Sequence, residues 1–264
     1  MTTEYLYKYL GKLEIRKSDS LNYVKRIFTY SEIFLSPASN FNDPFDCSFT
    51  LDYIGSHEEK REFCVNELMK EPGREEHERA ELTNVVDRGI NISTMNSQIS
   101  ESVLKEYSAK IRNLVGVFCL TSKNDNILMW SHYSSKHQGF CLQFKYVESP
   151  FFQNSIEIPQ KVEYSTQYPV INLLKSFEHE EMKKMFLVKA PDWTYEDEFR
   201  VVEQDSGVKK FFDHLLTGVI FGCKMPEEHK ILIRDWAFKR RIALKFYQAQ
   251  IKDKEYGLEI NEID

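Results

Sequence analysis

Short apolar runs of strand length alternate along the chain with polar segments whose apolar residues recur at helical spacing. Residues 5–9 alternate β-forming side chains, and residues 116–120 and 140–144 are apolar runs of the length typical of strands. The same patterns predict further strands at residues 32–35, 161–164, 193–202, 218–222, 242–250 and 256–260. Because strands and helices follow one another without a regular βαβ repeat, the pattern favours an α+β fold.

Helical spacing is clearest in a long charged segment, residues 56–115, which begins with a capping box formed by Ser56 and Glu59. Further helices are expected at residues 20–29, 171–188 and 226–240. We interpret residues 1–264 as a single α+β domain, with residues 56–115 as a helical insertion within it. The insertion could be a lid, a partner-binding surface, or simply cover for one face of the sheet.

Composition narrows the classes of protein to consider. The net charge is −6, so no global basic field favours nucleic-acid binding. The five cysteines are odd in number and include no CxxC pair, which argues against a disulfide framework and against a cysteine zinc site. No stretch approaches the roughly 18 apolar residues of a membrane span, and the first residues lack the features of a secretory signal. We therefore expect a soluble, cytoplasmic protein without membrane association.

Three polar clusters can carry chemistry, and the first lies in the turn-rich loop 36–46. Asn42 and Asp43 precede a proline that restricts the backbone before it to extended conformations. We expect Phe41 and Phe45 to anchor the loop to the core, which leaves the two polar side chains available for hydrogen bonds.

The second cluster, between two expected strands, comprises Trp130, Ser131, His132, Tyr133 and His137. The two histidines are five residues apart, so they do not share a helix face, and a zinc-binding helix of the HExxH type is disfavoured. With a distant carboxylate they could still form a metal site. In the structural alternative, the tryptophan and tyrosine belong to the core, one histidine is a buried hydrogen-bond donor, and the other is exposed.

The third cluster is Glu196, Glu198 and Arg200, at positions i, i+2 and i+4 of the strand expected at 193–202. On a strand these side chains project from one face. Neighbouring carboxylates raise each other's pKa, and Arg200 can offset this effect. The cluster is therefore either a functional site or an exposed sheet face with a cross-strand salt bridge.

Four motifs carry a resemblance to an uncharacterised bacterial family of unknown function. They are the LYKY-like strand Leu6–Tyr9, the FNDPFD segment Phe41–Asp46, the MWSHYxxxHxGFCLxF segment Met129–Phe144 and the WxYExEFR segment Trp193–Arg200. The resemblance spans most of the chain apart from the helical insertion.

The order of these motifs also resembles, more distantly, that of the ADP-ribosyltransferase superfamily, whose E-x-E motif corresponds to Glu196, Asp197 and Glu198. The resemblance implies an ADP-ribosyltransferase-like split mixed or antiparallel β-sheet core, NAD as a substrate and no metal. Glu198 would be the catalytic glutamate, holding the ribose 2′-OH and stabilising the oxocarbenium-like charge of nicotinamide release. Glu196 would orient or deprotonate the acceptor.

The resemblance also implies a set of NAD contacts. Related transferases carry a histidine on the opening strand, where this chain has Lys8 between Tyr7 and Tyr9, so the histidine's role would pass to His132 or His137. The other implied contacts are stacking by Trp130 and Tyr133, pocket-wall or ribose contacts by Asn42 and Asp43, and support of Glu198 or a phosphate contact by Arg200.

The function implied in this way is that of an NAD-dependent ADP-ribosyltransferase-like enzyme. It would be a bacterial toxin or phage-defence effector that modifies a protein or nucleic acid, with a cognate antitoxin or regulatory partner. Two other interpretations stay open. One is a metal-dependent hydrolase or nuclease built from Asp43, His132, His137 and Glu198. The other is a non-catalytic sensor or partner-binding module whose interface is the segment 56–115.

Overall fold

The computed structural model describes all residues except 1–3, 15–16, 90–100 and 176–181. It has a mixed α+β structure, as the sequence pattern predicts, with parallel and antiparallel pairs in its main sheet. The strands of this sheet are β1 (Tyr5–Leu10), β2 (Glu32–Pro37), β4 (Gly116–Thr121), β5 (Phe140–Lys145), β6 (Gln160–Lys161), β10 (Glu198–Glu203), β11 (Gly207–Lys210), β12 (Leu216–Phe221), β13 (Lys245–Ile251) and β14 (Leu258–Ile263). Two small parallel pairs join β3 (Thr50–Asp52) to β8 (Val170–Asn172) and β7 (Glu163–Tyr164) to β9 (Val188–Lys189).

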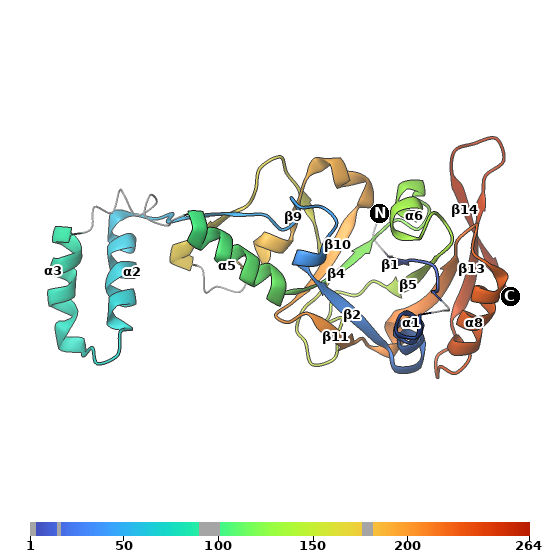
Figure 1. Cartoon of the computed structure of the whole chain (residues 1–264), viewed down its shortest axis with the longest axis horizontal. Helices are drawn as coiled ribbons and strands as arrows, with labels where there is room; N and C mark the ends of the chain where they lie inside the picture. Colours follow the sequence, from blue (N-terminus) through green and yellow to red (C-terminus); the bar gives the residue numbers. More distant parts are fainter. Residues whose placement is uncertain (1–3, 15–16, 90–100, 176–181) are drawn as a thin grey trace.

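Helices surround the sheet on several sides (Figure 1). The described α-helices are α1 (Ser18–Tyr30), α2 (His57–Met69), α3 (Arg79–Gly89), α5 (Glu101–Leu114), α6 (Ile127–Tyr133) and α8 (Glu227–Ala237). The described 3-10 helices are η1 (Ala38–Asn40), η2 (Glu76–Glu78), η4 (Leu173–Lys175), η5 (Lys184–Phe186), η6 (Pro191–Glu196) and η7 (Asp213–Leu215). Within the described part of the chain, no helix combines the length and the apolar character needed to cross a membrane.

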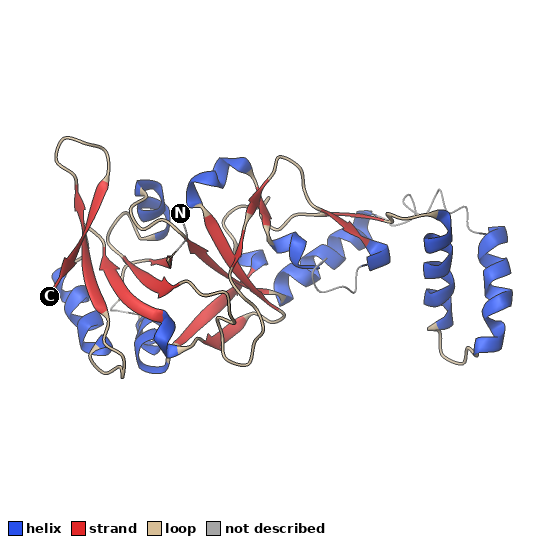
Figure 2. Cartoon of the chain, turned by 180° about the vertical axis from the view of Figure 1, so that it is seen from behind, coloured by secondary structure: helices blue, strands red, loops and turns tan. Residues whose placement is uncertain are grey.

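The main sheet is divided at a single residue pair. β1 is paired with β5 along its whole length, but it meets β4 only at Tyr7 and Thr121. β4 in turn is paired along its whole length with β10. The sheet therefore has two halves, one containing β1, β5, β12, β13 and β14 and the other β2, β4, β6, β10 and β11 (Figure 2). Where β1 and β4 diverge, the backbone leaves space between them.

Both halves contribute to one apolar core, which α1 and α8 cover. Phe118 of β4 is fully buried in this core together with Ile27 and Phe28 of α1. The rings of Phe28 and Trp236, from α1 and α8, lie 6.4 Å apart. Because side chains alternate along a strand, residues next to Phe118, such as Cys119, face the opposite side of the sheet. That opposite side carries the candidate site.

The helices α2 and α3 form a hairpin that stands apart from the sheet (Figure 1). The hairpin has a small apolar cluster of its own, formed by Cys64, Val65, Leu82 and Val86. The capping box of Ser56 and Glu59 is present at the start of α2. The helices expected within residues 56–115 thus include α2, α3 and α5, and residues 90–100 of that segment lie outside the described residues.

The helix predicted at 171–188 holds only at Met182 and Lys183 among the described residues of this segment, and the rest is not α-helical. β8 continues to Asn172, and 3-10 turns occupy Leu173–Lys175 and Lys184–Phe186. Residues 176–181 lie outside the described residues. The ends of the segment pair with β3 and β7, so tertiary strand pairing overrides the local helical spacing.

The strand predicted at 193–202 begins later than expected. Pro191–Glu196 form a 3-10 helix with proline in its first turn, where proline is well tolerated. Asp197 then takes a left-handed φ of 42°, and β10 starts at Glu198. Glu196 therefore leaves the strand face that Glu198 and Arg200 share.

A left-handed turn follows α6. Ser135, Lys136 and His137 have φ values of 47°, 57° and 68°, a region that residues other than glycine rarely adopt. The turn continues into Gly139, where an added Cβ would lie 2.1 Å from the Leu10 carbonyl oxygen. The turn is therefore packed directly against the end of β1.

Replacing Gly139 with alanine should lower the free energy of unfolding by about 1–3 kcal/mol, because the new methyl group would overlap the Leu10 carbonyl. Gly257→Ala is the matched control, since its Cβ would meet only the movable Lys252 side chain, at 3.2 Å. Urea denaturation measures both variants. Equal stability of the two would contradict the close packing of the turn on β1.

Candidate active site

A cavity of about 430 Å³ opens where β1 and β4 diverge. Its wall is built from β1, β2, β4, β10, α6, β9 and the loop that follows β2. Eight of the residues singled out in the sequence line it: Tyr7, Lys8, Tyr9, Asn42, His132, Tyr133, Glu196 and Glu198. Members of all three polar clusters thus meet in one cavity, although they are far apart in the sequence.

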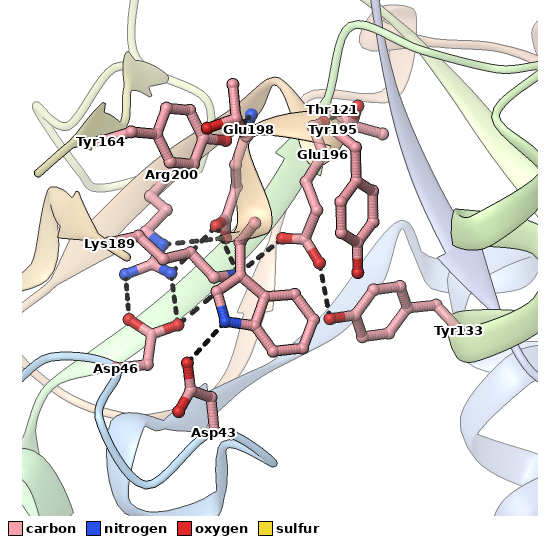
Figure 3. Close-up of polar contacts among 12 residues, drawn as sticks. Asp43, Asp46, Thr121, Tyr133, Tyr164, Lys189, Tyr195, Glu196, Glu198 and Arg200 are labelled. Carbon is pink, nitrogen blue, oxygen red and sulfur yellow. Dashed lines mark hydrogen bonds and ion pairs between the residues drawn. The ribbon is translucent and has the colours of Figure 1, made fainter. Parts of the chain in front are cut away.

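Arg200 lies fully buried behind this cavity (Figure 3). Its guanidinium donates to both carboxylate oxygens of Asp46, at 2.9 and 2.7 Å, and its Nε donates to Glu198 Oε1 at 2.8 Å. The third cluster is therefore not an exposed sheet face. Arg200 supports Glu198, and because it is fully buried outside the cavity lining, the geometry does not support a direct phosphate contact.

Lys189 joins the carboxylates of the site. Its Nζ lies 2.6 Å from Glu196 Oε2, 3.0 Å from Glu198 Oε2 and 3.6 Å from Asp46 Oδ2. Burial disfavours a charged ammonium group, but the carboxylates outweigh this and raise the pKa of Lys189. One lysine therefore holds two glutamates at the cavity wall.

Glu196 is the carboxylate whose ionisation is disfavoured. Tyr133 donates its hydroxyl to Glu196 Oε1 at 2.7 Å, and Lys189 occupies the other oxygen. Burial raises the pKa of Glu196, Lys189 opposes the rise, and the charge on Glu198 adds to it, with a net upward shift. Glu196 is thus suited to exchange a proton nearer to neutral pH than an ordinary glutamate.

Glu198 is shifted in the opposite direction. Burial by itself would raise its pKa, but Arg200 and Lys189 outweigh that effect and lower the pKa of Glu198 to about 2. Glu198 therefore stays ionised while its neighbour Glu196 can hold a proton. Two carboxylates with divided pKa values are the arrangement by which enzymes separate a charge-stabilising group from a proton-transfer group.

The helix α6 brings Tyr133 to this pair. Asn126 caps the helix, since its side chain accepts from Leu128 N at 2.9 Å and Met129 N at 3.2 Å. The same side chain donates to the Tyr195 carbonyl at 2.8 Å. This bond ties the start of α6 to η6, so the end of the helix reaches Glu196.

Trp130 does not bind a ligand in this cavity. Its ring is fully buried and outside the cavity lining, its Nε1 donates to the Asn124 carbonyl at 2.8 Å, and it packs edge-on against Tyr9 at 5.0 Å. The geometry does not support the stacking role expected for Trp130, because the ring packs inside the protein and anchors α6. Tyr133 does line the cavity, with its hydroxyl bonded to Glu196.

The two histidines occupy different environments. His132 is exposed and lines the cavity. His137 stacks on Trp130 with ring centroids 6.3 Å apart, and its Nε2 lies 3.2 Å from Ser131 Oγ. Burial lowers the pKa of His137, and its side chain lies outside the lining. A ligand contact by His137 is thus not supported, because its ring instead stacks on Trp130 and contacts Ser131 next to the left-handed turn.

Some residues of the loop after β2 line the cavity, and others hold the loop in place. Asn42 lines the cavity, whereas Asp43 is buried outside the lining and accepts from Trp193 Nε1 at 2.7 Å. The geometry does not support the ligand contact expected of Asp43, since this carboxylate joins the loop to η6 through Trp193. Phe45 is 64% exposed, so only Phe41 packs inward as an anchor.

Lys8 supplies positive charge to the cavity from β1. Its Nζ lies 5.1 Å from the Phe118 ring centroid. Among the described side chains, no carboxylate lies within ion-pair distance of Lys8, unlike Lys189. Lys8 is therefore a lining residue of the cavity whose charge has no ion-pair partner among the described side chains.

Sequence reasoning missed Asp46, Lys189 and Cys119, which also line the cavity. Asp46 closes the FNDPFD motif and could have been selected as the acid that follows the second phenylalanine. A lone lysine between Phe-Leu-Val and Ala-Pro is a signal for a buried cation at position 189. Nothing in the sequence pattern distinguishes Cys119 from an ordinary core cysteine.

No set of three or more histidine, cysteine, aspartate or glutamate side chains in the described part of the chain is arranged to hold a metal ion. Asp43 and His137, two of the four groups named for the metal-dependent alternative, lie outside the cavity lining. The described residues therefore give the metal-dependent alternative no geometric support.

Residues 129–201 match a family model described as "Protein of unknown function (DUF2971)". The matched range holds all of the second and third polar clusters, and it also includes Lys189. The chain is similar to this uncharacterised family over the matched range, and the match specifies no activity. No curated protein and no solved structure matches the chain.

Proposed function

We propose that the cavity binds NAD and that the protein breaks the nicotinamide–ribose bond and transfers ADP-ribose to a nucleophile on a protein or nucleic acid. The observation that carries the proposal is the pair Glu196 and Glu198, held by one lysine at the cavity wall with pKa values shifted in opposite directions. The divided sheet, with its cavity at the division, is in keeping with the split core implied by the motif order.

The two carboxylates suit the two halves of this reaction. When the bond from ribose C1′ to the nicotinamide nitrogen breaks, its electron pair leaves with neutral nicotinamide and the ribose gains oxocarbenium character. The ionised Glu198 stabilises that charge and accepts a hydrogen bond from the ribose 2′-OH. The acceptor then bonds to C1′, and its proton passes to Glu196, whose raised pKa makes it the better base.

The remaining lining residues can recognise the rest of the dinucleotide. Lys8, without a carboxylate partner among the described residues, suits the pyrophosphate. His132 and Asn42 offer hydrogen-bonding groups, and the aromatic walls of Tyr7 and Tyr9 border the same space. A volume of about 430 Å³ is within the range of small-molecule sites.

Incubating the protein with NAD should release nicotinamide, measured by liquid chromatography, and NAD labelled in the adenylate part should leave label on an acceptor in a bacterial lysate. Titration calorimetry with a non-cleavable NAD analogue checks binding separately. If NAD is neither bound nor consumed, with or without lysate, the proposal is wrong.

The variant that tests recognition of the pyrophosphate is Lys8→Met, which nearly keeps the length of the side chain and removes its charge. It should weaken binding of the NAD analogue about tenfold or more, the scale of a lost hydrogen bond to a charged group. Binding of nicotinamide riboside, which lacks the pyrophosphate, should change much less. An equal loss for both ligands would place Lys8 away from the phosphates.

A further inference from the structure

Lys189 contacts three buried carboxylates and also borders two cavities. Its ammonium group is the shared partner of Glu196, Glu198 and Asp46, at 2.6, 3.0 and 3.6 Å. Three carboxylates around one nitrogen would repel one another strongly without it, because all of them are buried. Arg200 balances Asp46 and Glu198 but makes no contact with Glu196 among the described bonds.

Lys189 also separates two cavities. It lines the candidate active site, and it lines a second cavity of about 290 Å³ whose other residues include Phe45, Tyr168 and Pro191. Its Nζ lies 4.9 Å from the Trp193 ring centroid. A small molecule can therefore approach the position of this side chain from either cavity once the side chain is shortened.

We propose that Lys189 is the positioning residue of the site, whose ammonium group keeps the Glu196 and Glu198 carboxylates side by side and controls which of them carries a proton. This inference rests on the proposed function for its catalytic consequence. Its structural content, the hold of Lys189 on the two carboxylates, can be measured without any substrate.

The environment of Glu196 shows why the lysine decides its protonation. The groups that face it are Tyr133 of α6, Lys189 of β9, Glu198 of β10, Tyr195 of η6 and Tyr164 of β7. Lys189 is the cation in this set, and the others are a carboxylate and neutral hydroxyls. Without the ammonium group, Glu196 loses the cation that stabilises its ionised form and still faces the Glu198 carboxylate, so the pKa of Glu196 must rise further.

The test is Lys189→Ala, followed by addition of propylammonium, which restores the missing chain and charge. Carbon-13 NMR of labelled glutamate, with Glu196→Gln to assign the signal, should show the Glu196 titration midpoint rising by about one pH unit or more. Propylammonium should return the midpoint toward the wild-type value, and neutral propanol should not. In NAD cleavage, kcat should fall about 100-fold with little change in KM, and propylammonium should restore at least part of it.

Lys183→Ala is the matched control. Lys183 and Lys189 are each 7% exposed, and Lys183 pairs with Glu157 at 2.7 Å outside the candidate active site. The control should lose stability but leave the Glu196 midpoint and its response to propylammonium unchanged. An unshifted midpoint in Lys189→Ala, or equal shifts in both variants, would overturn the inference. If the wild type does not cleave NAD, the proposed function fails, and the NMR measurement still decides the role of Lys189.

Discussion

Arg200→Met is expected to lower the free energy of unfolding by about 3–5 kcal/mol, the cost of removing one partner from a buried ion pair. Methionine fills much of the same space but leaves Asp46 without its two guanidinium bonds, at 2.9 and 2.7 Å. It also removes the bond to Glu198 at 2.8 Å. Both carboxylates are buried, so neither can recover these contacts from bulk water.

Thermal and urea unfolding measure this loss against Arg26→Met. The Arg26 side chain is 50% exposed and pairs with Glu32 at the surface, where an ion pair contributes only about 0–1 kcal/mol. Adding Asp46→Asn to Arg200→Met should recover part of the stability, because it removes one of the unpaired charges. A single variant as stable as Arg26→Met would show that the buried charges are not coupled as the contacts indicate.

Glu196→Gln and Glu198→Gln should each lower kcat for NAD cleavage and transfer by about 100-fold or more, but in different ways. Glu196→Gln removes the base, but its amide oxygen can accept from Lys189 and its amide NH2 can donate to the Tyr133 hydroxyl, so transfer should fall more than binding and most of the stability should remain. Glu198→Gln removes the charge beside the ribose. It also takes one carboxylate partner from the buried Arg200, so both kcat and stability should fall.

Glu259→Gln on the exposed side of β14 is the control for both variants, since it makes the same chemical change away from the cavity. Nicotinamide release, label transfer and urea unfolding are measured for all three proteins. If both pocket variants retain the activity of this control, the carboxylate pair has no part in the chemistry. If only Glu196→Gln retains it, proton transfer must be assigned to another group.

The parts of the fold that follow from local pattern could be predicted from the sequence. The apolar runs 116–120 and 140–144 became central strands, and the capping box at Ser56 marks the start of α2. Segments ordered by distant partners could not. Val188 and Lys189 are strand residues only because β7 lies beside them, and no periodicity within 171–188 encodes that pairing.

The candidate site was predictable as a set of segments and less so as a set of side chains. Glu196 and Glu198 were found from their spacing, yet the expected strand face was the wrong reason, since Glu196 reaches the cavity from a 3-10 helix. The sequence does not reveal that Trp130 and His137 pack on each other outside the cavity lining, because polar atoms on aromatic rings can bond to the scaffold as readily as to a ligand. The sequence pattern does not indicate Lys189, because its role depends on three carboxylates that come together only in the folded chain.

The hairpin of α2 and α3 has a consequence for how cooperativity is distributed over the molecule. Its apolar cluster is formed within the hairpin, whereas the buried charged residues Glu198 and Arg200 lie on β10, which pairs with β4 in the main sheet. Free energies of local opening differ between such units. We therefore expect amide hydrogens of α2 and α3 to exchange with solvent through local openings that leave the amides of β4 and β10 protected. The hairpin can then unfold and refold while the contacts between Arg200 and Glu198 stay formed.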